Sequence, residues 1–271
     1  LPAPFVQWMP TQRETPMILL ETHELTKQFG GLTAVNAVSM HINEGDIVGL
    51  IGPNGAGKTT LVNAIAGLNP PTSGRVILFG ENTTGKSPEK MCRRGLSRTF
   101  QIPVPFPKMT VLENVMTAAI FGNRPGRVKD PAAHSRRMLE FVDFPIAEDT
   151  VSEQLNTVQL KRLDLARALA SGPKMLFLDE LASGLSEGEL KDMIALIFKI
   201  RDQGITILMI EHIMQLIMNL CNRLVCIQFG TKIAEGTTEQ VANDPVVTKA
   251  YLGDSADMCT PEARQPAPEN G

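Results

Sequence analysis

A glycine-rich loop between an apolar strand and a helix constrains this chain more than any other feature. Residues 52–60 read Gly-Pro-Asn-Gly-Ala-Gly-Lys-Thr-Thr and fit the phosphate-loop pattern G-x-x-x-x-G-K-[ST]. We expect a strand over Asp46–Ile51 before the loop and a helix over Lys58–Leu68 after it. A strand, a glycine loop and a helix in this order favour a layered α/β fold.

The residue types in this loop are those that bind a chain of phosphates. The glycines allow a tight turn in which successive N–H groups point at an anion, and the start of the helix adds its positive dipole end. Lys58 supplies a charge for the β- and γ-phosphates, and the Thr59 hydroxyl is placed to ligate Mg²⁺. The loop residues that we expect to bind ATP are Gly52, Asn54, Gly55, Gly57, Lys58, Thr59 and Thr60.

Composition and charge weigh against several other classes of protein. The chain of 271 residues is 43% hydrophobic with a net charge of −3, so it has no basic excess that would favour a nucleic-acid partner. No stretch reaches the roughly 18 continuous apolar residues of a membrane span, so a role at a membrane requires a partner. The four cysteines lack the spacing of metal ligands and indicate free thiols: Cys92, Cys221, Cys226 and Cys259.

Strand and helix patterns divide the chain into a core and an inserted helical lobe. The stretch 102–107 contains three prolines and can form neither a helix nor a central strand, and the pattern from Thr110 to about Leu169 is helical. Buried strands resume at Met175–Leu178 and Ile205–Ile210. We therefore predict an α/β core from residues 17–95 and 165–253, a helical subdomain over 96–164, a flexible extension over 1–16 and a disordered tail over 254–271.

Four polar residues lie where these elements end or begin. Asp179 and Glu180 end an apolar strand, where Asp179 can hold Mg²⁺ through water and Glu180 can orient and deprotonate an attacking water. His212 follows the strand Ile205–Ile210 and is placed to hydrogen-bond the γ-phosphate. Gln101 opens the helical lobe, where it can contact Mg²⁺ and report the nucleotide state to the lobe.

This order of phosphate loop, glutamine, Asp-Glu strand and histidine resembles the ATPase subunit of ABC transporters, over roughly residues 18–253. The resemblance implies a RecA-like P-loop core with an inserted helical subdomain, in which two subunits enclose two ATP molecules head to tail. It also implies that Phe29 stacks on the adenine. Each site then uses the phosphate loop of one subunit and a signature motif of the other.

The signature motif of this chain departs from the family pattern Leu-Ser-Gly-Gly-Gln. Residues 155–159 read Leu-Asn-Thr-Val-Gln, although the following helix matches well. The resemblance places Asn156 and Gln159 against the opposite nucleotide. Val158 adds a β-branched side chain where close backbone approach is expected. A weakened composite site and an active site with altered geometry both stay open.

Several segments are similar to the branched-chain amino-acid importers in particular, namely 98–101, 109–115, 241–245 and 250–253. This similarity implies a peripheral subunit at the cytoplasmic face of the membrane. Its expected partners are membrane-spanning permease subunits, a second identical or different ATPase subunit and, indirectly, a solute-binding protein, with no nucleic acid. The stretch 102–109 and the helix after it would line the groove for a membrane subunit.

Other functions in the same family stay open. Urea and short-chain amide importers share these motifs, and lipopolysaccharide-export ATPases share some of them. A regulatory module that binds ATP without turnover would suit the variant signature, but Glu180 and His212 favour hydrolysis. A soluble ABC ATPase acting on ribosomes or DNA is disfavoured by the single cassette and the acidic charge.

Overall fold

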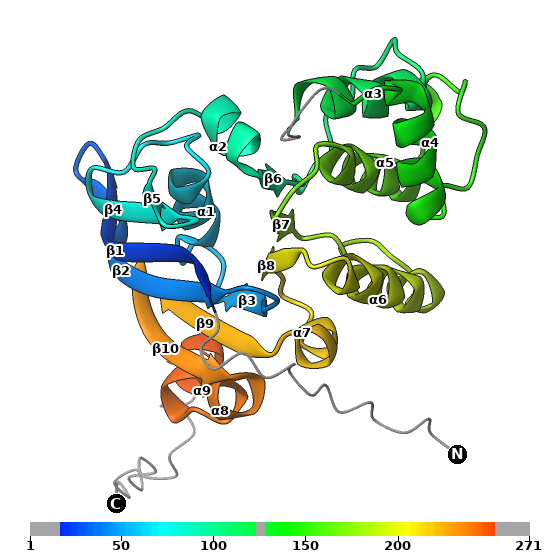
Figure 1. Ribbon diagram of the computed structural model, residues 1–271. Helices are drawn as coiled ribbons and strands as arrows, with labels where there is room; N and C mark the ends of the chain where they lie inside the picture. Colours follow the sequence, from blue (N-terminus) through cyan, green and yellow to red (C-terminus); the bar gives the residue numbers. More distant parts are fainter. Residues whose placement is uncertain (1–16, 123–127, 253–271) are drawn as a thin grey trace, which may run out of the picture.

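A mostly parallel six-stranded sheet forms the centre of the molecule in the computed structural model, which describes residues 17–122 and 128–252 (Figure 1). The strand order is β10-β9-β3-β8-β7-β6, and only the edge strand β10 runs antiparallel to its neighbour. The strands are β3 (Ile47–Ile51), β6 (Leu96–Arg98), β7 (Met175–Asp179), β8 (Thr206–Ile210), β9 (Arg223–Gln228) and β10 (Thr231–Thr237). Every residue of β3, β7 and β8 is buried, as continuous apolar runs in a covered parallel sheet require.

A second, antiparallel sheet of order β2-β1-β4-β5 lies beside the first. Its strands are β1 (Ile18–Phe29), β2 (Leu32–Asn43), β4 (Ser73–Leu78) and β5 (Glu81–Asn82). Helix α1 (Lys58–Ile65) packs with both sheets, since its buried face shares one core cluster with residues of β1, β2, β3 and β9. The loop before α1 therefore lies at the junction of the two sheets.

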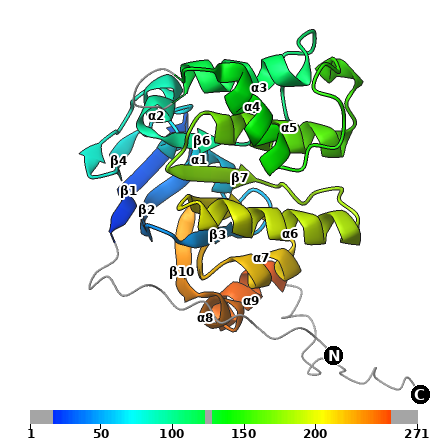
Figure 2. The same cartoon turned by 45° about the vertical axis from the view of Figure 1, so that its right-hand side comes forward.

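Three helices form a separate lobe at the end of the molecule opposite α8 and α9 (Figures 1 and 2). They are α3 (Val111–Phe121), α4 (Pro131–Phe141) and α5 (Thr157–Ala170), which pack against one another. Each begins at a polar residue whose side chain accepts a hydrogen bond from the first helical turn: Thr110, Asp130 and Asn156. Local sequence thus determines where these helices start.

The observed elements differ from the expected domain boundaries at two places. Strand β6 falls within the stretch assigned to the helical subdomain, yet it pairs in parallel with β7. Helix α5 continues through the expected boundary between residues 164 and 165. A strand of three residues is too short to show a period in the sequence, which is why it was missed. The predicted extension over 1–16 and the predicted tail over 254–271 lie outside the described residues.

The remaining helices cover the sheet and follow its last strands. They are α2 (Pro88–Arg94), the single turn η1 (Ser152–Gln154), α6 (Glu187–Asp202), α7 (Met214–Leu220), α8 (Thr238–Ala242) and α9 (Pro245–Leu252). The sequence predicts α2 from Ser87 and Pro88 at its start and α6 from its apolar stripe, whereas α7, α8 and α9 are short helices that the sequence analysis does not predict. Within the described ranges, none of the helices combines the length and the apolar character that a membrane crossing needs.

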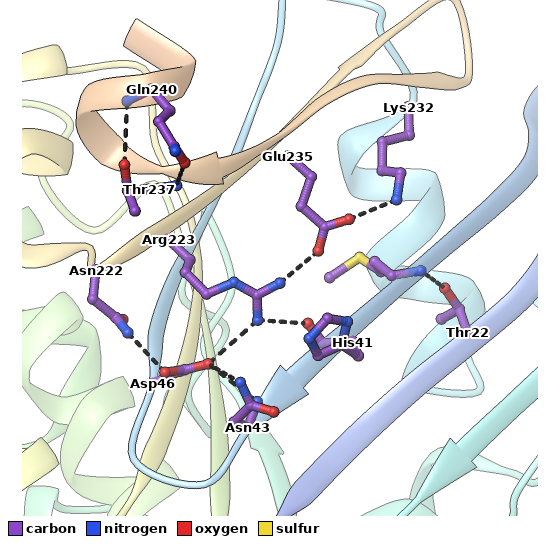
Figure 3. A network of polar contacts seen from close by, with 11 residues as sticks. Thr22, His41, Asn43, Asp46, Asn222, Arg223, Lys232, Glu235, Thr237 and Gln240 are labelled. Carbon is purple, nitrogen blue, oxygen red and sulfur yellow. Dashed lines mark hydrogen bonds and ion pairs between the residues drawn. The ribbon is translucent and has the colours of Figure 1, made fainter. Parts of the chain in front are cut away.

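A network of polar contacts attaches the hairpin of β9 and β10 to the start of β3 (Figure 3). The Arg223 guanidinium contacts Glu235 at 2.6 Å and Asp46 at 3.5 Å. Asp46 in turn accepts from the Asn222 amide at 2.7 Å. The side chains of Arg223, Asp46 and Glu235 are largely buried, so their contacts attach the hairpin firmly to the start of β3.

Candidate functional site

The glycine-rich loop runs from the end of β3 to the start of α1 and lies tightly against neighbouring backbone. Gly57 has φ of 102°, and a Cβ there would lie 2.4 Å from the Ala34 carbonyl oxygen of β2. Gly52 has φ of 148°, and a Cβ there would lie 2.0 Å from the Ile227 carbonyl oxygen of β9. Only glycine fits at these two positions, so the backbone itself forms the wall of the site.

Lys58 is held over this loop by the loop's own carbonyl groups. Its ammonium donates to the carbonyl oxygens of Gly52 at 2.6 Å and Pro53 at 2.9 Å. Burial lowers the pKa of Lys58 below its usual value, and the negative charge of Glu180 opposes that shift. The Lys58 ammonium thus places a positive charge beside the glycine-rich loop, where the N–H groups of the loop would bind a phosphate.

A pocket of about 600 Å³ opens above the loop. Residues 54–60 form one side, and Phe29, residues 32–34, Glu180, Phe229 and Gly230 complete the lining. One face of the Phe29 ring is covered by the Lys27 ammonium, 4.9 Å from the ring centre. The residues present fit a nucleotide, because glycine N–H groups and Lys58 suit the phosphates and an aromatic ring suits a base.

Phe229 is a lining residue that sequence reasoning missed. Its side chain is 84% exposed at the turn between β9 and β10, where its φ of 47° places it in the left-handed region. A large aromatic side chain left in solvent beside Gly230 is unusual. An aromatic residue followed by glycine at the predicted hairpin turn, Phe229-Gly230, is the sequence feature that could have indicated this lining position.

The carboxylate of Asp179 is buried and paired with Arg98. The Arg98 guanidinium contacts Asp179 Oδ2 at 2.6 Å and also donates to the Asn63 side chain of α1. Arg98 and Asp179 expose only 8% and 6% of their side chains. Because an isolated buried carboxylate is costly, the Arg98 guanidinium supplies the charge partner of Asp179 in the interior. Arg98 lies 81 positions before Asp179, so no local pattern in the sequence indicates this partner.

Gln101 and Glu180 lie in direct contact. The Gln101 amide donates to Glu180 Oε2 at 2.6 Å, which brings together two of the predicted catalytic residues. Glu180 has φ of 46° and lines the pocket, whereas Gln101 is exposed at its edge. His212 follows β8 with an exposed side chain and is not among the residues that line the pocket.

The two predicted signature residues form a capping box at the start of α5. Asn156 Oδ1 accepts from the Gln159 N–H at 3.0 Å, and Gln159 Oε1 accepts from the Asn156 N–H at 3.0 Å. Neither residue lines the pocket of its own chain. Their contact with a nucleotide stays a prediction that requires a second subunit.

A hydrogen bond connects the last described helix to the phosphate loop. The Gly52 N–H donates to the Tyr251 hydroxyl of α9 at 2.8 Å. Burial raises the pKa of Tyr251, and the bond from Gly52 opposes that shift. Helix α9 also lines one side of a neighbouring pocket of about 530 Å³, and residues 53–56 of the phosphate loop line another side.

Comparison with known families identifies the chain. The family model described as "ABC transporter" matches residues 35–183, more than half of the sequence. The chain belongs to the ABC transporter ATP-binding family. A second model, "Branched-chain amino acid ATP-binding cassette transporter", matches residues 231–257 of this ABC ATPase.

Curated relatives match nearly the whole of their own length. The ABC ATPase is 39% identical to "High-affinity branched-chain amino acid transport ATP-binding protein BraF" of Pseudomonas aeruginosa, covering 88% of this chain and 98% of the relative. It is 38% identical to the LivG protein of the same description in Escherichia coli (strain K12), with the same coverage. A probable LivG protein of Archaeoglobus fulgidus is 35% identical, covering 88% of this chain and 96% of that protein.

Solved structures confirm the predicted fold class. A nucleotide-free ATP-binding cassette from an ABC transporter superposes with a TM-score of 0.80 at 33% identity, covering 88% of this chain and all of the other. A cassette in its ADP conformation gives a TM-score of 0.78 at 34% identity, covering 88% and 99%. This ABC ATPase therefore has the P-loop core with an inserted helical lobe, and it is a nucleotide-binding ATPase of a transporter.

Metal-binding clusters are not a feature of this ABC ATPase in the part that the structure describes. No group of three or more His, Cys, Asp and Glu side chains there is arranged so that it could hold a metal ion. Cys92, Cys221 and Cys226 are free thiols, and Cys259 lies outside the described residues.

Proposed function

We propose that this chain is the ATP-hydrolysing subunit of an importer for branched-chain amino acids. The observation that carries the proposal is the match of residues 231–257 to a branched-chain transporter model, joined to whole-length relatives described as branched-chain amino acid transport proteins. The core motifs are common to the whole family, so the C-terminal segment is what favours this solute class.

The phosphate loop would hold ATP with Mg²⁺ in the pocket described above. Gly52, Asn54, Gly55, Gly57, Lys58, Thr59 and Thr60 would surround the phosphates, and Phe29 would stack on the adenine. Thr59, Gln101 and Asp179 would hold Mg²⁺, which when bound neutralises charge on the phosphates. The position of Asp179 at the carboxyl end of the buried strand β7 supports this role.

Glu180 would orient the attacking water and accept its proton, and His212 would hydrogen-bond the γ-phosphate. The Gln101 amide occupies Glu180 Oε2 in the structure. Hydrolysis then requires the water to use the other carboxylate oxygen or Gln101 to move away. A movement of Gln101 would also report the nucleotide state to the helical lobe, to which it is joined.

Membrane-spanning permease subunits and a second ATPase subunit would be the direct partners, with a solute-binding protein acting indirectly. The stretch expected to contact the permease is strongly apolar and exposed: Ile102, Val104 and Phe106 expose 76%, 72% and 48% of their surface. Beside it lies a groove of about 370 Å³ lined by Phe100, Val104 and Arg167, among others. These features support a peripheral position at the cytoplasmic face of the membrane.

The test is uptake of labelled leucine in cells deleted for this chain and complemented with wild type or Glu180→Gln. Restoration by wild type alone is expected. Unchanged uptake after deletion would refute the solute assignment, and labelled urea and acetamide would then be assayed in the same strains. Restoration by Glu180→Gln as well would instead support a nucleotide-binding regulatory subunit without turnover.

A further inference from the structure

Two buried charged side chains hydrogen-bond to the backbone of the turn that follows Glu180. Lys161 of α5 and Glu211, just after β8, expose 4% and 2% of their surface. The sequence analysis assigns neither residue a role at the nucleotide site. Both contact the backbone of residues 180–183, which connects β7 to the segment before α6.

Lys161 holds the carbonyl side of this turn. Its ammonium donates to the carbonyl oxygens of Glu180 at 3.3 Å, Leu181 at 3.0 Å and Ser183 at 2.5 Å. An ammonium has three donors, so this lysine is fully used by one short segment. Burial lowers the pKa of Lys161, and the charges of Glu211 and Glu180 oppose that shift.

Glu211 holds the amide side of the same turn. Its Oε1 accepts from the Ala182 N–H at 2.9 Å, whereas its buried Oε2 has no hydrogen-bond partner in the described part of the chain. Burial raises the pKa of Glu211 above its usual value.

The turn sets the conformation of the proposed catalytic base. Glu180 has φ of 46°, a strained conformation for a residue with a side chain, and its N–H donates to the Ile210 carbonyl oxygen at 3.0 Å. Such a conformation persists only where the surroundings enforce it. Lys161 and Glu211 supply that enforcement from two sides.

We propose that Lys161 and Glu211 are positioning residues: they keep the Glu180 side chain oriented for catalysis, and Lys161 connects Glu180 to the start of α5. Lys161 lies in the same helix as Gln159, two residues further on. A shift of the first turn of α5 therefore moves the Lys161 ammonium, which hydrogen-bonds to the turn after Glu180. The signature end of α5, which is expected to face the second subunit, is thereby mechanically linked to the base of the chain's own site. This inference rests on the proposed role of Glu180 in ATP hydrolysis.

The test measures ATP turnover and ATP affinity of the purified full chain and matched variants. Lys161→Met keeps the length and apolar stem of the side chain but removes the charge, and Lys161→Arg keeps the charge and several donors. Glu211→Gln keeps an acceptor for the Ala182 N–H, and Glu211→Leu removes it. Lys191→Met, at an exposed position of α6, is the control for loss of a lysine.

We expect Lys161→Met and Glu211→Leu to lose about 10- to 100-fold in kcat, the scale of a misplaced catalytic group. The KM for ATP should stay within about twofold, because the phosphate loop is untouched. Lys161→Arg should retain a higher kcat than Lys161→Met, and Glu211→Gln should retain a higher kcat than Glu211→Leu.

Three results would overturn the inference. They are a near-normal kcat for Lys161→Met, equal kcat values for Glu211→Gln and Glu211→Leu, or a parallel loss of kcat and ATP affinity that marks a merely structural role. If Lys161→Met fails to fold, the two Glu211 variants decide the question. Absence of turnover in the wild type, alone and with its membrane subunits, would instead refute the proposed function.

Discussion

The bond between Tyr251 and Gly52 gives a sharp prediction about the phosphate loop. In Tyr251→Phe the ring remains, but the Gly52 N–H loses the acceptor that lies 2.8 Å away. A buried N–H without a partner costs about 1–3 kcal/mol. Because Tyr251 is 42% exposed, water can reach the vacated position, and the lower end of that range, about 1 kcal/mol, is expected.

That free energy should be visible in ATP affinity. If the bond holds the loop in its binding conformation, losing about 1 kcal/mol weakens ATP binding about fivefold. Calorimetric titration of wild type and Tyr251→Phe with ATP measures the change directly. Val246→Ala, at an exposed position of the same helix, is the control for disturbance of α9.

Two outcomes would refute this reasoning. An unchanged ATP dissociation constant would show that the loop keeps its conformation without the hydroxyl. An equal loss of affinity in Val246→Ala would assign the effect to packing of α9 rather than to the hydrogen bond.

The other predictions concern charge, chemistry and titration. Lys58→Ala should abolish ATP binding, and retained affinity in the same titration would remove Lys58 from the phosphate site. Glu180→Gln should still bind ATP but hydrolyse it at least about 10²-fold more slowly, the scale of a lost general base, in a steady-state phosphate-release assay. Restoring Ser-Gly-Gly at residues 156–158 should raise or preserve turnover if the motif is merely weakened, whereas a collapse would show that it is adapted to its partner. Tyr251 is the only tyrosine of the chain, so the absorbance of tyrosinate reports its ionisation alone. Burial should keep the pKa of Tyr251 in the folded protein above the ordinary value of about 10, and unfolding should remove this shift. The folded state then holds this proton more tightly, so the stability that it contributes is present below pH 10 and is lost as pH rises through the native pKa.

The sequence predicted those parts of the fold that carry a local or periodic signal. The strands β3, β7 and β8 are continuous apolar runs, and Thr110, where the helical pattern begins, stands directly before the first residue of α3. The phosphate loop has a pattern that few other structures satisfy. Each of these features depends on neighbours within a few residues.

Contacts between distant residues account for what the sequence could not predict. Tyr251 and Gly52 are 199 positions apart, and Arg98 meets Asp179 across 81 positions. Lys161 looks like an ordinary member of a basic helix until the turn after Glu180 packs against it. The assignment of Asn156 and Gln159 to a nucleotide concerns a second subunit, so it remains a prediction, as do the other roles of the site residues.

The contacts of the phosphate loop with β2, β9 and α9 imply that bound nucleotide stabilises the core more than the helical lobe. Gly57, Gly52 and Tyr251 join the loop to segments spread over most of the core, so ATP bound there acts as a ligand of the whole core rather than of one loop. A ligand at 100 times its dissociation constant stabilises the folded state by about 2.7 kcal/mol. In amide hydrogen exchange, saturating ATP should therefore slow the deepest openings of both sheets, while α3 and α4 keep the opening rates of the free protein.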